Sequence, residues 1–408
     1  TALTPMNQDG DRIYALVPRL IRHLAYKKSF AVPCGGLEQT VREESARVTL
    51  DYDIPVTASE TAGKLVKVWK KNVRGASASQ YDIRDMIPYT DIETDCVVYG
   101  QDTLACVLEL DAGRADEKHT LALEAVKSVL ADGAPGNVLS LVFFGAARAG
   151  EESAPSLYLV LYGADKKALR ARAGEAQTLL RNGGFGCAIL KDRDLARFMR
   201  RNYSHPFDKT LNAVPERDLY AWSLPWSMRI FRNRLKIEDT AVSCYRVARY
   251  PAAAWDEALF SLPGVKVVMQ IHAVAETASR RRARREMDGG FIEKTGQAPP
   301  LLTDIADGVE KVADVNTYVS AYYPAFPDKK RGIQSAVPQL DRLRAEGFEL
   351  DPLYLQQFDA YVGAGITKGD PLRHKAMGVP LGTIADMITL ACAARRRAEN
   401  GSAELTHR

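Results

Sequence analysis

The stretch Cys96-Val-Val-Tyr-Gly-Gln-Asp-Thr-Leu-Ala-Cys-Val-Leu-Glu-Leu110 decides the fold class of this chain, because it predicts a β-hairpin. Cys96–Tyr99 and Leu104–Leu110 are apolar runs of strand length, and Gly100-Gln-Asp-Thr103 between them has the residue types of a tight turn. A chain that begins a unit in this way is building an antiparallel sheet.

The residues that follow the hairpin alternate between helical and strand patterns. The predicted order is strand, helix, strand, strand, helix, strand, which is the order of a ferredoxin-like sandwich. The elements after the hairpin are a helix from about Asp116 to Ala131, strands Val138–Phe144 and Ser156–Tyr162, a helix capped by Asp165 that ends at Gly183-Gly184, and the strand Phe185–Leu190.

A similar order returns from about Ala241 to Leu350, with longer helices. Its predicted elements are the strands Val242–Val247, Val265–Val274, Asn316–Tyr322 and Phe348–Leu350, and the helices within Pro251–Leu262, Glu276–Met287, Leu302–Val312 and Asp328–Glu346. The duplication predicts two compact units in one chain.

The predicted fold class is therefore α+β, with two ferredoxin-like α/β sandwich units in tandem, an N-terminal strand-helix extension and a C-terminal helical tail. The predicted divisions are the extension at 1–80, the first unit at 81–203, a Trp-containing connector at 204–240, the second unit at 241–351 and the C-terminal helical segment at 352–408. We expect the connector to pack against a domain or a partner, with Trp222 and Trp226 mostly buried.

Composition sets limits on the class of protein. The chain has 408 residues, of which 46% are hydrophobic, and a formal net charge of +4, which is typical of a folded protein and not of a polyelectrolyte binder. The six cysteines form no CxxC pair, so we expect buried free thiols. No apolar run approaches the ~18 residues that a membrane-spanning helix needs. The sequence begins at Thr1 and not at Met, so flanking segments are to be expected.

Motifs for catalysis are missing from the sequence. Gly363-Ala-Gly-Ile-Thr-Lys-Gly-Asp370 has the residue types of a phosphate loop in the wrong order, so we interpret it as a flexible loop. There is no G-x-S-x-G elbow, and the six histidines share no metal-ligand spacing. His272 ends an apolar strand, which is typical of a packed core residue. We predict no catalytic, cofactor or metal residue.

Two basic segments are the candidate contact sites. The first is an amphipathic stretch with Leu16, Leu20 and Leu24 on its apolar side. It either lies against an anionic membrane or another acidic partner, or packs on the predicted strand Arg47–Ile54 as a structural helix. Its candidate contact residues are Arg12, Arg19, Arg22, Lys27 and Lys28.

The second basic segment is the densest run of charge in the chain, Arg280, Arg281, Arg282, Arg284 and Arg285. One interpretation is a solvated helix face that pairs with Glu276 and Glu286. The other is a contact with an acidic partner or a phosphate backbone, although no aromatic side chain lies between Ala275 and Gly290.

Three stretches resemble the amino-terminal region of type IV secretion and conjugative-transfer ATPases. The first is Asp85-Met-Ile-Pro-Tyr-Thr-Asp-Ile-Glu with the hairpin that follows it, and it is similar to the family's "I-P-x-x-x-I" opening. The second, Tyr245-Arg-Val-Ala-Arg-Tyr-Pro251 after Ile237, resembles the family's "R-x-Y-x-V-x-x-Y-P" strand. The third is Asp341–Gly347, which leads into Phe348–Gln357. Together they cover roughly residues 80 to 390.

The resemblance implies a role in a transfer machine but assigns no catalytic residue to this chain. The family's phosphate loop, acidic magnesium-site motif and arginine finger have no counterpart in this sequence, so no catalytic residue is carried over. Asp11–Phe30 resembles the segment that follows the membrane helices of small inner-membrane partners of these ATPases. What the resemblance implies is a domain that anchors a motor to the inner membrane and contacts other secretion subunits.

The leading hypothesis is therefore an assembly and membrane-coupling module of a conjugative DNA-transfer machine, located in the cytoplasm at the inner face of the cell membrane. Its expected partners are other secretion subunits, further copies of the chain and the membrane surface, with direct nucleic-acid contact not expected. The alternatives are a small-molecule enzyme with a cleft between the two units, and a DNA-binding accessory protein of the transfer apparatus.

Overall fold

The chain has a mixed α/β fold built on one large sheet. The described strands form a single sheet of fourteen strands, in which every pair is antiparallel except β1 (Leu50–Asp51) with β8 (Met228–Phe231). The computed structural model describes residues 50–51, 87–99, 103–111, 119–131, 138–145, 155–204, 206–207, 209–231, 234–251, 259–260, 262–287, 300–324, 338–353, 356–367 and 369–406.

The first group of elements has the chain order that the sequence predicts. Its strands pair antiparallel in the spatial order β7-β4-β6-β5. The Asp165 carboxylate accepts the backbone N–H of Ala168 at 2.6 Å, which confirms the predicted helix cap. The elements are β4 (Thr103–Asp111), α4 (His119–Ala131), β5 (Val138–Phe144), β6 (Ser156–Gly163), α5 (Lys166–Asn182) and β7 (Gly186–Ile189).

The second group repeats this pairing, in the spatial order β13-β10-β12-β11. Its elements are β10 (Thr240–Arg249), β11 (Val265–Ala273), α8 (Glu276–Glu286), α10 (Pro300–Asp307), β12 (Val312–Pro324), α11 (Pro338–Ala345) and β13 (Glu349–Asp351). The predicted helix Leu302–Val312 is wrong at its end, because Gly308 takes a positive φ of 81° and the chain then turns into β12.

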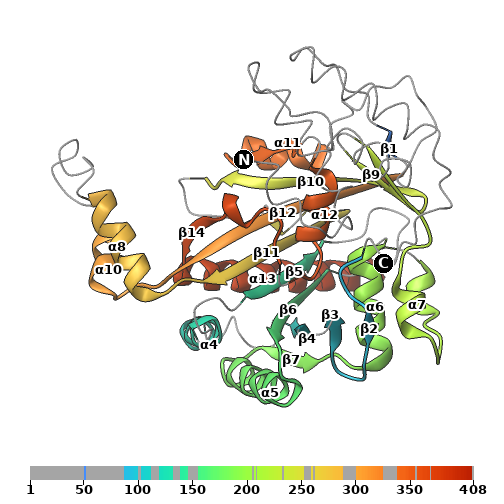
Figure 1. The fold of residues 1–408 in the computed structure, drawn as a ribbon, viewed down its shortest axis with the longest axis horizontal. Coiled ribbons are helices and arrows are strands. Elements are labelled where there is room, and N and C mark those ends of the chain that lie inside the picture. Colours follow the sequence, from blue (N-terminus) through green and yellow to red (C-terminus); the bar gives the residue numbers. More distant parts are fainter. Residues whose placement is uncertain are drawn as a thin grey trace, which may run out of the picture.

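The two groups are joined through their edge strands (Figure 1). β5 and β11 pair antiparallel, from Phe144 opposite Lys266 to Val138 opposite His272, so one sheet runs through both groups. The remaining strands are β2 (Asp91–Ile92), β3 (Val97–Tyr99), β9 (Leu235–Ile237) and β14 (Met377–Pro380). The β5–β11 ladder fixes how the two groups sit relative to one another, which the local sequence pattern does not predict.

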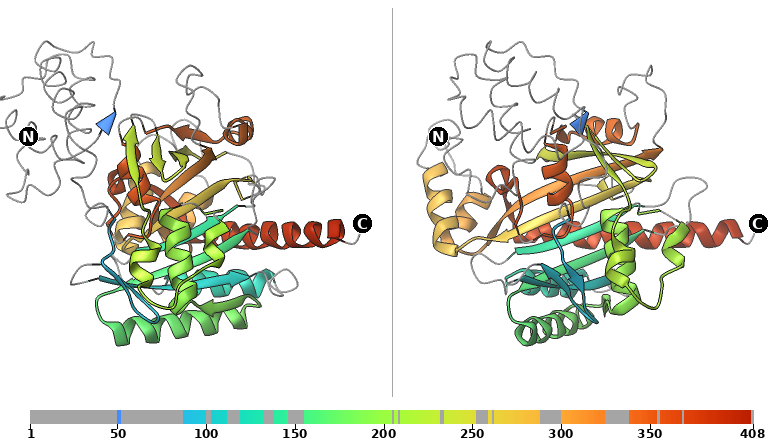
Figure 2. Two further views of the ribbon diagram at one scale, coloured as in Figure 1. Left: turned by 90° about the vertical axis from the view of Figure 1, so that its right-hand side faces the viewer. Right: turned by 45° about the vertical axis from the view of Figure 1, so that its right-hand side comes forward.

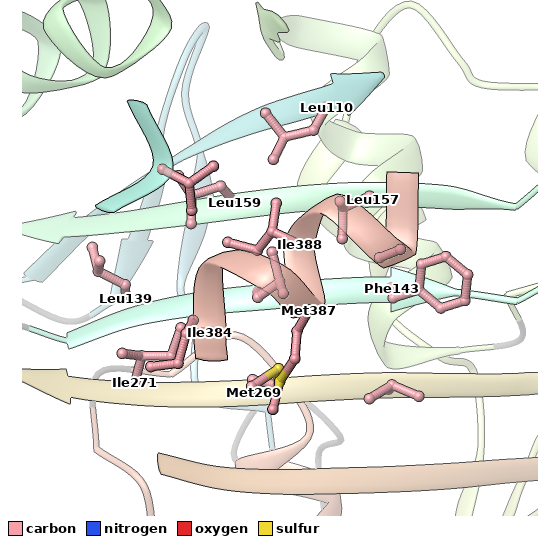
Figure 3. Close-up of a cluster of buried hydrophobic side chains, with 14 of the residues drawn as sticks. Leu110, Leu139, Phe143, Leu157, Leu159, Met269, Ile271, Ile384, Met387 and Ile388 are labelled. Carbon is pink, nitrogen blue, oxygen red and sulfur yellow. The ribbon is translucent and has the colours of Figure 1, made fainter. Parts of the chain in front are cut away.

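One face of the sheet is covered by α4, α5, α11 and the long C-terminal helix α13 (Leu381–Thr406). Figure 3 shows side chains of α13 lying over the β5–β11 seam, where residues of both groups meet. The end of α13 extends beyond the rest of the described fold (Figure 2). The buried residues of this contact include Ile384, Met387 and Ile388 of α13, Leu139 and Phe143 of β5, and Met269 and Ile271 of β11.

The opposite face is covered by α6 (Asp192–Tyr203), α7 (Leu219–Ser223), α12 (Gln357–Gly363) and the residues that follow α12. This layer is rich in tyrosine. The rings of Tyr203 and Tyr361 meet edge to face with centroids 6.0 Å apart, and Tyr89 packs on Tyr203 at 5.3 Å. Both faces of the seam are therefore bridged by elements from more than one part of the chain.

The connector differs from its prediction at one of its two tryptophans. It contains α7, β8 and β9. Its Trp222 is half-buried, but Trp226 is 66% exposed, so the prediction that both are mostly buried is wrong for Trp226. Only its backbone is held, since its N–H donates to Glu238 at 3.1 Å. The described residues between α12 and Asp370 have no regular secondary structure, as predicted for a loop, but they are packed into the fold, since Ile366 is fully buried.

Other predictions are confirmed within the described residues. The hairpin of β3 and β4 and the helices of the C-terminal tail are present. Five cysteines are buried and free, namely Cys96, Cys106, Cys187, Cys244 and Cys392. No helix in the described ranges has both the length and the hydropathy to cross a bilayer.

Candidate interaction surface

The arm, which we define as α8 with α10, stands at the far ends of β11 and β12 and projects from the body of the sheet (Figure 1). Its two helices pack on one another through a small apolar cluster of Ala283, Ile305 and Ala306, with Met287 and Leu302 at the margin. A projection with so small a core of its own presents most of its surface to solvent.

Two of the five arginines of α8 hold the arm in place. Arg280 pairs with Glu276 one turn away at 2.5 Å, and its guanidinium packs so closely on Gly308 that a side chain there would overlap it. Arg282 reaches Asp314 on β12 at 2.9 Å. These contacts join α8 to the end of α10 and to the sheet, so Arg280 and Arg282 have structural roles.

The other three arginines of the run point away from the packed side of the arm. Arg281, Arg284 and Arg285 are exposed, and none of them forms an ion pair with any residue that the structure describes. Ser279 and Ala283, at i and i+4, are the buried side chains of α8, and Arg281 and Arg285 lie on the opposite side of the helix. We call Arg281, Arg284 and Arg285 the basic face of the arm.

The first predicted contact site lies outside the described residues, and with it Arg12, Arg19, Arg22, Lys27 and Lys28. The second site is therefore the candidate surface that the structure brings together. It divides the arginine run into two residues that form ion pairs and three that form none with any described residue, a division that the sequence alone left open.

A buried polar layer lies on the α6 and α12 side of the seam. Lys266 of β11 is fully buried, and its ammonium donates to the backbone carbonyl of Asn202 at 2.8 Å and to Asn202 Oδ1 at 3.2 Å. Asn202 is in the last turn of α6, where the helix dipole favours a cation. Burial nevertheless lowers the pKa of Lys266 to about 7, since the charged form loses its hydration.

Gln270, two residues along the same strand, ties both groups to the segment after α12. Its amide nitrogen donates to the carbonyls of Gly363 and Gly365 at 2.9 and 3.0 Å. Its carbonyl accepts from Ser140 of β5 at 2.6 Å, and the Ser140 hydroxyl also lies 2.7 Å from Tyr162 OH. This chain of hydrogen bonds crosses the seam and satisfies the buried amide.

Asp370 is the centre of the remaining polar contacts. It accepts from Tyr318 OH at 2.5 Å, from Asn316 Nδ2 at 2.6 Å and from the Leu372 N–H at 3.0 Å, while His272 Nε2 lies 3.6 Å away. Burial alone would raise the pKa of Asp370, but these donors outweigh it and hold the pKa below its usual range. The segment after α12 is thus fastened to β11 and β12.

These buried groups do not form an open reaction site. The His272 and Asp370 side chains are 1% and 0% exposed, and the predicted packed role of His272 is confirmed. The described residues contain no group of three or more metal-ligand side chains. A cavity of about 380 Å³ lies between α4 and α5, on the other side of the sheet. Lys266, Gln270, His272 and Asp370 do not line it.

Sequence reasoning missed the polar layer because its members are far apart in the chain. The one available signal was a lysine, a glutamine and a histidine at alternate positions of the apolar strand Val265–Ala273, which places all three on one face. In comparisons with known proteins, no family model matches this sequence and no curated protein matches it.

Proposed function

We propose that the chain is an assembly and membrane-coupling module of a conjugative, type IV secretion-like DNA-transfer machine, equivalent to the amino-terminal part of its ATPase. In this role it acts through contacts with other subunits. The observation that carries the proposal is the arm, a projecting pair of helices that is braced by Arg280 and Arg282. It presents three exposed arginines that form no ion pair with any described residue.

The arrangement of the strands supports the finer part of the proposal. The orders β7-β4-β6-β5 and β13-β10-β12-β11 are those expected of two ferredoxin-like units, and we propose that each group is one such unit. Their fusion through β5 and β11 makes a continuous scaffold. A rigid scaffold holds a binding arm at a fixed distance from other contacts, which suits a coupling module.

The position of the three resembling stretches also supports it. From Ile87 onward the first lies on β2, β3 and β4, the second lies on β10 and the turn after it, and the third on α11 and β13. The first and second stretches thus fall at the starts of the two groups, and the third falls at the end of the second group. The proposed membrane contact rests on the basic segment Arg12–Lys28, which lies outside the described residues.

The rival enzyme hypothesis needs a substrate cleft between the two groups. At the seam, the described residues instead form a ladder covered by α13 on one side and by hydrogen-bonded segments on the other. Gln270 and Asp370 are hydrogen-bonded to neighbouring residues, whereas both ring nitrogens of the buried His272 have no hydrogen-bond partner among the described residues. This packing favours a scaffold over a small-molecule enzyme.

The test is conjugative transfer in the cells that encode the chain. Deletion of its gene should abolish transfer, and the wild-type gene supplied in trans should restore it. Purified chain should neither hydrolyse ATP nor bind it saturably. Normal transfer after deletion would contradict the proposal, and tight ATP binding would support a nucleotide-dependent enzyme instead.

A further inference from the structure

Resting on the proposed function, we infer that the basic face of the arm is a docking surface for an acidic α-helix of another protein subunit. Arg281, Arg284 and Arg285 would pair with carboxylates that recur at i, i+3 and i+4 on the partner helix. The inference names the class of partner and the residues that select it.

The charge distribution of α8 is the first observation behind it. Arg281 lies three and four positions before Arg284 and Arg285, so the cations are neighbours on one helix surface. Like charges at this spacing destabilise a helix. The last-turn positions of Arg284 and Arg285 are favourable next to the helix C-terminus, but Arg281 has no such compensation. The cluster is unfavourable for α8 alone and becomes favourable when carboxylates approach.

The shape of the outward side of α8 is the second observation. Thr277 and Ala278, which precede the arginines, are small and exposed. A helix can approach closely over these two residues while the longer arginine side chains reach out to it. Because guanidinium groups bind carboxylates through two parallel hydrogen bonds, the three arginines also fix the register of the partner.

The arm is less suited to a nucleic acid. From Arg281 to Arg285 the basic face rises only ~6 Å along the helix axis, which is about one turn. Proteins that bind the phosphate backbone of DNA usually neutralise many more phosphates than three arginines can contact. Val309 is the one large hydrophobic side chain exposed on or beside the described arm, and the described residues of α8 and α10 include no aromatic side chain on which a base could stack.

The preorganisation of the arm strengthens the inference. Arg282 pairs with Asp314 of β12 and the Arg280 guanidinium packs on Gly308 after α10, so α8 is already held against the sheet and α10 before a partner arrives. Binding then has to order the three outward side chains and the partner, and not the helix that carries them. A reversible, salt-sensitive contact of this kind suits the assembly of a machine from separate subunits.

The experiment measures binding of the purified chain to a synthetic helical peptide of about 20 residues. The probe carries Glu at i, i+3 and i+4 positions on one face. Two comparison peptides carry Gln at these positions, or the same number of Glu residues spread around the helix. A single-stranded oligonucleotide and a duplex of equal charge test the phosphate alternative, and titrations at two salt concentrations test the ionic character.

Charge reversal of the basic face provides the decisive variant. Arg281→Glu/Arg284→Glu/Arg285→Glu should weaken binding of the Glu peptide about 3- to 150-fold, since it removes three exposed ion pairs that contribute ~0.2–1 kcal/mol each. A peptide with Lys in place of Glu should bind this variant and not the wild type. The matched control changes three exposed cations elsewhere, Lys167→Glu/Lys191→Glu/Arg217→Glu, and should bind as the wild type does. Thermal unfolding checks that both variants are folded.

Several results would overturn the inference. Equal binding of the Glu and Gln peptides would show that the basic face does not recognise the negative charge of the peptide. Equal binding of the one-faced and spread peptides would remove the spacing argument. DNA binding that is lost in the basic-face variant would assign the surface to phosphates, and failure of the Lys peptide to bind that variant would exclude direct pairing. The transfer assay is separate from these, so the docking inference can fail while the proposed function stands.

Discussion

Lys266 gives a prediction whose sign changes with pH. Lys266 lies on β11 between β5 and β12. Its side chain is fully buried under α6, and its ammonium has only Asn202 as hydrogen-bond acceptor among the described residues. Burial lowers its pKa from 10.5 to about 7. The substitution Lys266→Met keeps most of the side-chain volume and removes the titrating group, so it separates the effect of charge from that of packing.

The magnitude follows from the linkage between protonation and folding. Between pH 7 and 10.5 the unfolded chain binds a proton at Lys266 that the folded chain does not, so the stability of the wild type should rise with pH in this range. At ~1.36 kcal/mol per pH unit the full difference is about 5 kcal/mol. It is present as a penalty at pH 6 and is absent by pH 10.5.

The substitution also has a cost. It leaves the Asn202 carbonyl without its donor, which destabilises by ~1–3 kcal/mol. The balance predicts that Lys266→Met is more stable than the wild type by roughly 2–4 kcal/mol at pH 6 and less stable by ~1–3 kcal/mol at pH 10.5.

Urea unfolding at pH 6, 8 and 10 measures both the sign and the slope. Lys167→Met, at an exposed lysine of α5, is the matched control and should change stability by less than ~0.5 kcal/mol at each pH. If Lys266→Met were destabilised equally at pH 6 and pH 10, the wild-type lysine would be charged and well stabilised in the fold, and the reasoning from burial would be refuted.

Three further predictions concern the fold. Ile388→Ala should lower the free energy of unfolding by ~2–5 kcal/mol in urea titrations, because it opens a cavity where α13 covers the seam; a loss below ~1 kcal/mol would contradict this contact. Gly365→Ala should destabilise the chain strongly, since its Cβ would lie 2.6 Å from the Tyr203 ring. Truncation of Tyr203 in the same chain should not restore full stability. A Gly365→Ala variant with the thermal midpoint of the wild type would exclude this close packing. The hydrogen bonds from Arg170 lower the pKa of Asp95 in the folded chain. The stabilisation by the Asp95 carboxylate should therefore be present above the ordinary carboxyl pKa and be lost as the pH falls through the folded pKa. Asp95→Asn should reduce this loss of stability in acid, and an unchanged dependence of stability on pH would contradict the prediction.

Local patterns in the sequence predict much of this fold because the signals are local. Asp165 and the glycines at 183 and 184 mark the two ends of α5, and the hairpin of β3 and β4 has its turn residues between two apolar runs. The order of elements in each group follows from these signals.

The arrangement of the two groups was beyond the reach of local patterns. The β5–β11 ladder pairs residues more than 100 positions apart, and the sequence of neither strand indicates which other strand it pairs with. Trp226 was expected inside because indole burial is favourable, but a backbone hydrogen bond to Glu238 holds the loop with the ring outward.

The candidate site divides in the same way. The arginine run of α8 was visible as charge in the sequence, whereas the roles of its members depend on Gly308 and Asp314, which lie after a second helix. The glycines of the segment after α12 suggested flexibility. They are required because Tyr203 and Tyr318 occupy the space that side chains at Gly365 and Gly363 would need.

The most direct test of the account is photo-crosslinking from the basic face in conjugating cells. A photoreactive amino acid in place of Arg285, which lies in the last turn of α8, should form covalent adducts with another subunit encoded by the same transfer system, as identified by mass spectrometry. The same residue at position 167, on the exposed side of α5, is the control and should not give that adduct. Transfer that proceeds normally while position 285 gives no adduct with any transfer subunit would contradict the claim that this chain works as an assembly module through its arm.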